Sequence, residues 1–60
     1  MMVYVDVSFD CGKTITTKEF QTPQMALRFL YFCRRRCFFI MSYRADDPLD
    51  YQWLEKRFRL

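Results

Sequence analysis

The sequence contains no histidine and only one glycine, and these two shortages exclude most familiar catalytic designs. Without histidine, the chain cannot form the Ser-His-Asp or Cys-His arrangements in which an imidazole activates a nucleophile. The phosphate-binding loop and the dinucleotide-binding fingerprint each need several glycines to bring the backbone close to phosphate, and Gly12 stands alone. We therefore expect a protein that is not an enzyme and that uses no cofactor.

Cysteine is scarce as well, because Cys11, Cys33 and Cys37 are too few for a disulfide framework. With no histidine to add, they cannot complete the four ligands of a structural zinc site, so we expect no metal. Cys33 and Cys37 are four residues apart, which would place them on one helical face. The favoured interpretation is two buried, reduced thiols, and the alternative is a redox pair whose thiolates the neighbouring arginines stabilise.

Long hydrophobic runs are absent, since Arg34–Arg36 separates the apolar stretches Phe29–Phe32 and Phe38–Met41. No stretch approaches the roughly 18 residues that a membrane span needs. The N-terminus has no basic region and reaches Asp6 too early for a signal peptide. We expect a cytoplasmic protein that does not enter a membrane, with a helix end, a basic corner and a strand start at the arginine triplet.

Aromatic side chains, in contrast, are abundant, with seven Phe, four Tyr and one Trp among 60 residues. A chain of this length forms a single domain, here 1–60, and buries only about 60% of its unfolded surface. Each aromatic residue buries on the order of 150–250 Å² when it is covered. We expect some of this ring surface to stay exposed unless another protein chain covers it.

Two strands and a hairpin are predicted in the first third of the chain. Val3, Val5, Val7 and Phe9 alternate with polar residues, which is typical of a strand with one buried face. Residues 10–13 suit a turn, and residues 14–20 form a second, more polar strand that suits a sheet edge. Two-residue and three-residue loops both fit, and the slightly preferred three-residue loop sets Lys18 opposite Asp6.

A first helix is predicted from Pro23 to about Arg36, because Thr22 can cap it and proline is favoured at the first helical position. The arc expected to cover the sheet contains Met25, Ala26, Phe29, Leu30, Phe32 and Cys33. The opposite arc contains Gln24, Leu27, Arg28, Tyr31, Arg34 and Arg35.

A third strand, residues 37–44, is apolar on both faces, so we expect it at the centre of the sheet beside the first strand. Asp47 and Pro48 then predict the start of a second helix that ends near Phe58. The whole pattern indicates an α+β fold of order β-β-α-β-α, with a three-stranded sheet, a β-hairpin, one helix packed on the sheet and a short C-terminal helix.

Two surfaces are candidates for contact with a partner. The outward arc of the first helix combines Arg, Tyr and Leu, as protein interface cores do, although it also suits a solvated face: its candidate residues are Leu27, Arg28, Tyr31, Arg34 and Arg35. The second surface is a stripe on the last helix formed by Tyr51, Leu54 and Phe58. That stripe either packs on the uncovered sheet face, against Phe38 and Ile40, or forms a homodimer seam.

These residues favour a small non-enzymatic protein that binds another protein, either as a homodimer or as a regulator of a partner. A modulator of a host protein, of the kind that phages and other mobile elements encode, is one form of this expectation. The alternative, given a net charge of +3, is nucleic-acid binding through Arg28, Arg34, Arg35, Arg36 and Arg44, which would weaken steeply with salt. Asp46, Asp47 and Asp50 favour helix capping over a divalent-cation site.

Overall fold

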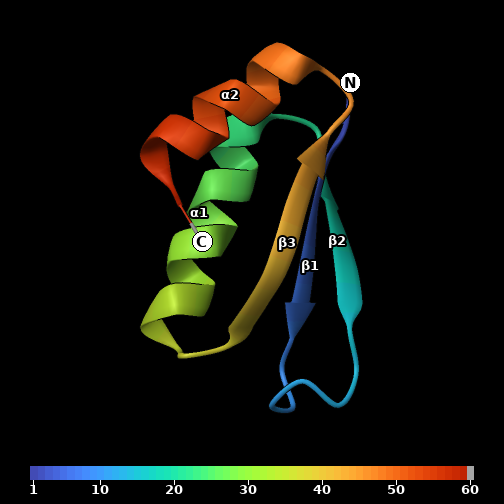
Figure 1. Cartoon of the computed structure of the whole chain (residues 1–60), viewed down its shortest axis with the longest axis vertical. Coiled ribbons are helices and arrows are strands. Elements are labelled where there is room, and N and C mark those ends of the chain that lie inside the picture. Colours follow the sequence, from blue (N-terminus) through green and yellow to red (C-terminus); the bar gives the residue numbers. More distant parts are fainter. Residues whose placement is uncertain (60) are drawn as a thin grey trace.

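The computed structural model describes residues 1–59, which form three strands and two helices in the order β-β-α-β-α (Figure 1). Their bounds are β1 Val3–Ser8, β2 Thr16–Phe20, α1 Pro23–Arg35, β3 Phe39–Ala45 and α2 Pro48–Arg57. The α+β fold class and the order of the elements are as the sequence predicts. Within residues 1–59, neither helix has the length and apolar character that crossing a membrane requires.

The sheet is antiparallel and has the strand order β2-β1-β3, so β1 pairs with both neighbours. The prediction that the third strand lies beside the first is confirmed, but the prediction that it is central is wrong. Both helices lie on one side of the sheet (Figure 1), so nothing covers the outward-facing apolar residues of β3. Phe39 and Met41 are consequently 49% and 46% exposed.

In the hairpin between β1 and β2, Asp6 lies opposite Thr17 rather than Lys18. This is the register of a two-residue loop, so the slightly preferred three-residue alternative is wrong. The ladder itself ends at Val7 and Thr16. Side chains organise this loop. The Asp10 carboxylate accepts hydrogen bonds from Ser8 Oγ and Thr14 N, each at 2.8 Å, and Ser8 Oγ accepts one from Gly12 N at 2.8 Å. Gly12 has a φ of 91°, a left-handed conformation that glycine adopts without strain. These bonds hold residues 9–15 outside the ladder, so β2 begins at Thr16.

Both predicted helix starts are confirmed. The Thr22 hydroxyl accepts a hydrogen bond from Met25 N at 3.3 Å, and the Asp47 carboxylate accepts one from Leu49 N at 2.9 Å. In each helix the proline follows the cap directly, where its missing N–H is not needed. Asp47 therefore has a capping role, and Asp50 lies in the first turn of α2, where negative charge is favourable.

The end of α1 is a Schellman motif formed without glycine. Phe38 N donates to Cys33 O at 2.9 Å, and Cys37 N donates to Arg34 O at 3.2 Å. Cys37 has a φ of 58°, so the chain turns out of the helix at this residue. The expected pair of buried thiols is therefore wrong: Cys33 is buried, and burial raises the pKa of its thiol, whereas Cys37 is exposed.

One core lies between the sheet and both helices. It is formed by Val3, Val5, Ala26, Leu30, Tyr43, Leu54 and Phe58. The stripe on α2 was expected to reach the uncovered sheet face or a second chain. Instead, Leu54 and Phe58 pack on the same sheet face as α1, because α2 lies beside α1 (Figure 1).

The opposite sheet face is open and polar, and its centre is Asp6. The Asp6 carboxylate accepts hydrogen bonds from Thr17 Oγ1 at 2.6 Å and Ser42 Oγ at 2.7 Å, and it forms an ion pair with Arg44 at 3.2 Å. The Arg44 guanidinium also stacks over Tyr4, 5.3 Å from the ring centroid. The polar groups of this face satisfy one another across all three strands.

Candidate interaction surfaces

The outward arc of α1 is partly occupied by α2. Leu27 packs against the core, and the Tyr31 hydroxyl donates a hydrogen bond to Arg57 O at 3.3 Å. The Arg34 guanidinium lies over two rings, 5.1 Å from the centroid of Tyr31 and 4.9 Å from that of Phe58. Three of the five predicted α1 residues therefore have contacts within the chain, and Arg28 and Arg35 are the members left free of them.

The predicted stripe on α2 is divided between core and surface. Leu54 is fully buried and Phe58 is 3% exposed, whereas Tyr51 is 39% exposed. The backbone carbonyl of Phe58 also accepts a 2.7 Å hydrogen bond from the Tyr43 hydroxyl. Only Tyr51 of this stripe is accessible to a partner while the fold is intact.

Four arginines lie within about one helical turn of Tyr31 on α1 or contact it from α2, and we call Arg28, Arg34, Arg35 and Arg57 the arginine cluster. All four side chains are exposed. Within residues 1–59 the only ion pair joins Arg44 to Asp6, so no carboxylate neutralises the cluster. Arg57 stacks on Trp53 at 4.0 Å and donates to its carbonyl at 3.1 Å, which holds its guanidinium in place.

Two other predicted nucleic-acid contacts lie away from this cluster. Arg44 lies on the open sheet face, on the side opposite the helices, where it pairs with Asp6. Arg36 follows the end of α1 and stacks over Phe32 at 5.5 Å. Arg57 is an exposed arginine that the sequence pattern did not suggest for this surface, because α2 reaches α1 only through the tertiary fold.

The outer edge of β3 is an accessible surface that sequence reasoning missed. Asp46 N donates to Met2 O at 3.0 Å, so Ser42 and Arg44 also turn their amides towards β1, up to the register shift that follows the Asp6–Ser42 pair. Because hydrogen-bonding direction alternates along an antiparallel strand, Tyr43 and Ala45 turn their N–H and C=O groups outward. An edge of this kind offers a ready backbone template for another strand.

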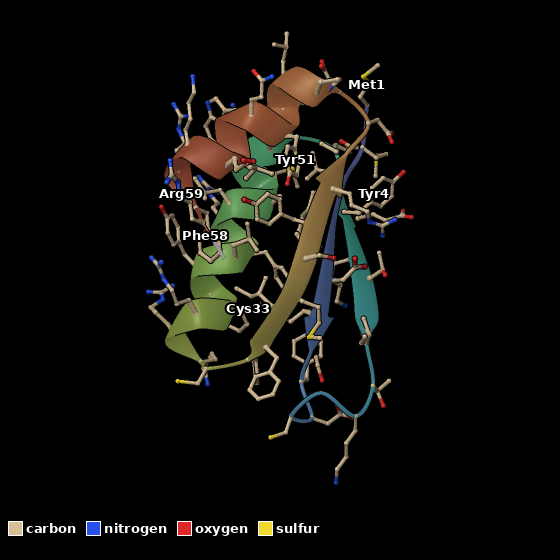
Figure 2. All side chains as sticks on the ribbon, viewed as in Figure 1. Met1, Tyr4, Cys33, Tyr51, Phe58 and Arg59 are labelled. Atoms are coloured by element: carbon tan, nitrogen blue, oxygen red, sulfur yellow. The ribbon has the colours of Figure 1, made fainter. Side chains whose placement is uncertain are left out.

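A groove of about 540 Å³ runs beside this edge, between β3 and α2, and is lined by Ser42, Tyr43, Tyr51, Glu55 and Arg59. Figure 2 shows Tyr51 in the space between α2 and β3, with Arg59 at the far end of α2. Burial raises the pKa of Tyr43, the neighbouring Tyr51 and Glu55 raise it further, and Arg59 opposes them. Tyr43 therefore stays a neutral hydrogen-bond donor at physiological pH.

A second, smaller cavity of about 220 Å³ lies where the hairpin meets the end of α1. It is lined by Ser8, Phe9, Cys11, Arg36, Cys37, Phe38 and Phe39. Phe9 and Phe38 meet edge to face, with ring centroids 4.9 Å apart. Within residues 1–59, no three His, Cys, Asp or Glu side chains are arranged to hold a metal ion.

Comparison of the chain with protein-family models, with curated proteins and with solved structures finds no match. The interpretation of these surfaces therefore rests on their own geometry and chemistry.

Proposed function

We propose that the chain is a non-enzymatic protein-binding module that accepts an extended segment of another polypeptide along the outer edge of β3. The observation that carries this proposal is the seven-residue β3 edge with its outward backbone groups, lying beside the groove under α2. In strand addition, main-chain hydrogen bonds supply affinity and side-chain pockets supply specificity. This edge and groove provide both.

The two edges of the sheet differ in how well they suit this role. β2 has only five residues and carries Lys18 and Glu19, and such short charged edges discourage pairing. β3 is longer and carries only one charged residue, Arg44, and it exposes Phe39 and Met41. The aromatic surface that a chain of 60 residues cannot cover thus lies partly along β3, where an added strand would cover it.

The groove supplies the side-chain contacts. Tyr51 offers an exposed ring and a hydroxyl, the type of side chain enriched at interface centres. Glu55 and Arg59 place one charge of each sign at the rim. The segment that fits this groove is an extended peptide with apolar side chains towards Tyr51 and at least one charged residue.

A displayed library of random peptides tests the proposal. We expect the protein to select extended sequences that shift the backbone amide resonances of Tyr43 and Ala45. Ala45→Pro removes one outward donor and should abolish this binding. The variant should still fold, since proline is tolerated at an edge position whose N–H faces solvent. Ala45→Gly keeps the donor and is the matched control.

Thermal unfolding of both variants establishes that each is folded before binding is compared. Selection of peptides that bind Ala45→Pro as well as the parent chain would contradict strand addition at β3. Failure to enrich any peptide that perturbs β3 amides would do the same.

The arginine cluster supports nucleic-acid binding as a second candidate function. Arginine binds phosphate in a bidentate manner, and the four guanidiniums are exposed with no carboxylate partner among the described residues. Arg28 and Arg35 are two helical turns apart on α1, about 10 Å along its axis. They could therefore contact successive phosphates on one strand.

Fluorescence anisotropy with a mixed-sequence single-stranded oligonucleotide tests this candidate. The double change Arg28→Gln with Arg35→Gln should weaken binding and reduce the dependence of log affinity on log salt by about 0.7 per lost phosphate contact. Lys13→Gln with Lys18→Gln alters the net charge equally, but in the hairpin, and should have a smaller effect. Absence of binding at low salt, or equal losses in both double variants, would exclude the cluster as a phosphate site.

A further inference from the structure

The groove beside β3 carries charges that complement a rotated copy of themselves. Glu55 and Arg59 line it together, one acidic residue on α2 and one basic residue just beyond its end. When a two-fold axis relates two identical surfaces, a residue away from the axis meets a different residue of the other copy, and the contact occurs twice. An acid and a base in one groove can therefore form two reciprocal ion pairs across such an axis.

We propose that the segment added to β3 is the β3 strand of a second copy of this chain, in a two-fold symmetric homodimer with Glu55 of each copy opposite Arg59 of the other. This inference rests on the proposed function, because it names the occupant of the same edge. Antiparallel pairing joins the two sheets into one of six strands, ordered β2-β1-β3-β3-β1-β2. The outward backbone N–H and C=O groups of Tyr43 and Ala45 then form hydrogen bonds with the second copy.

A register centred on Tyr43 is compatible with the side chains along the edge. It places Met41 of one copy opposite Ala45 of the other, which covers apolar surface that is exposed in the single chain. It also places Arg44 opposite Ser42, so no like charges face each other across the new ladder. Both α2 helices lie on the same side of the joined sheet, and their Tyr51 side chains approach the axis.

The alternative edge is less suited to self-pairing. β2 carries Lys18 and Glu19, and its exposed side chains are charged or polar for most of its length. An edge that carries charge and is short resists pairing with its own copy. The difference between the two edges therefore directs self-association to β3.

Sedimentation equilibrium and a pair of charge-reversed variants test the dimer. The parent chain should show twice its 7.5 kDa mass. Glu55→Arg and Arg59→Glu should each weaken the dimer by about ten-fold or more, since each variant sets like charges opposite one another. An equimolar mixture of the two variants should restore a dimer that contains one chain of each, because opposite charges then face each other across the axis.

The mixing step distinguishes an ion pair between two chains from a contact within one chain, because mixing cannot restore a contact within a chain. Glu19→Arg and Arg28→Glu make the same changes of charge outside the groove, so these controls should leave the dimer mass unchanged. In the parent dimer, the amide protons of Tyr43 and Ala45 should exchange slowly with solvent.

A parent chain that stays at 7.5 kDa up to millimolar concentration would overturn self-pairing. In that case, selected peptides that still bind β3 would leave the proposed function standing with another protein as partner. A dimer that survives both charge reversals would place the interface elsewhere and overturn the assignment to this groove.

Discussion

At the scale of single residues, Cys37 shows the cost of ending a helix without glycine. Its φ of 58° lies in the left-handed region, where a side chain costs roughly 1–2 kcal/mol. Cys37→Gly should raise the free energy of unfolding by about 0.5–1 kcal/mol, because the relief of strain exceeds the extra backbone entropy of glycine. Urea unfolding measures the change. Cys37→Ala keeps the strain and should gain nothing, and equal stabilities for Gly and Ala would contradict this account.

Asp6 is the residue whose charge matters most to the fold. Hydrogen bonds from Thr17 and then Ser42, together with the charge of Arg44, hold the pKa of Asp6 below its ordinary 3.8. A carboxyl group with a lowered pKa in the folded state stabilises the fold above the unfolded value, and this contribution is lost as the pH falls below about 4.

We therefore expect Asp6→Asn to lower stability at pH 7 by about 1.5–3 kcal/mol, the usual contribution of hydrogen bonds to a charged group. It should also flatten the loss of stability between pH 5 and about pH 2, which denaturant titrations at several pH values would measure. Glu19→Gln is the matched control, because Glu19 lies on the same sheet face opposite Tyr4. If Asp6→Asn leaves the dependence of stability on pH unchanged, another titratable group controls the loss of stability at low pH.

At the scale of elements, α2 is attached to the rest of the fold chiefly through its C-terminal end. Phe58 is 3% exposed, packs edge to face with Tyr31 at 5.6 Å and presents its carbonyl to Tyr43. Phe58→Ala should therefore cost about 3–5 kcal/mol, as large-to-small changes in a core do. Thermal unfolding measures this cost. Tyr51→Ala, on the exposed side of the same helix, should cost far less, and similar losses in both variants would mean that Phe58 is not a core residue.

The elements also show what the sequence could predict. Helix starts were predictable because Thr22–Pro23 and Asp47–Pro48 are local signals whose hydrogen bonds involve only nearby residues. The end of α1 was close to its prediction, but its left-handed residue was not foreseen, because cysteine gives no sign of that conformation. The turn composition alone could not decide between the two-residue and three-residue registers, because the bonds among Ser8, Asp10 and Gly12 that organise the loop are not evident from it.

The place of β3 in the sheet was mispredicted for a different reason. Its residues are apolar on both faces, which normally indicates a strand covered on both sides. With two helices on one side of the sheet, no layer remains for the other face, and Phe39 stays exposed. The candidate α1 surface is partly covered for a similar reason, because Leu27 packs against the core and Tyr31 contacts α2, a neighbour that no local pattern reveals.

At the scale of the whole molecule, successive ring contacts cover part of the abundant aromatic surface. Phe20, Phe29 and Phe32 follow one another at centroid distances of 5.3 and 6.3 Å, and Phe32 approaches Phe38 at 6.2 Å. This row of rings covers one flank of α1, and α2 covers the other. Part of the apolar surface left over, Phe39 and Met41, lies along β3, and the proposed dimer covers Met41.

If the folded chain is dimeric, its stability must depend on its concentration, because mass action favours the associated state. For the parent chain, we expect the midpoint of thermal unfolding to rise as protein concentration increases. A hundred-fold increase adds about 2.7 kcal/mol per mole of dimer to the free energy of unfolding. Glu55→Arg should have a midpoint that rises less over the same concentrations, because its dimer is weaker, whereas Glu19→Arg should behave like the parent. A parent midpoint that is independent of concentration would mean that folding is complete within one chain, and that β3 is stable with its outer edge in water.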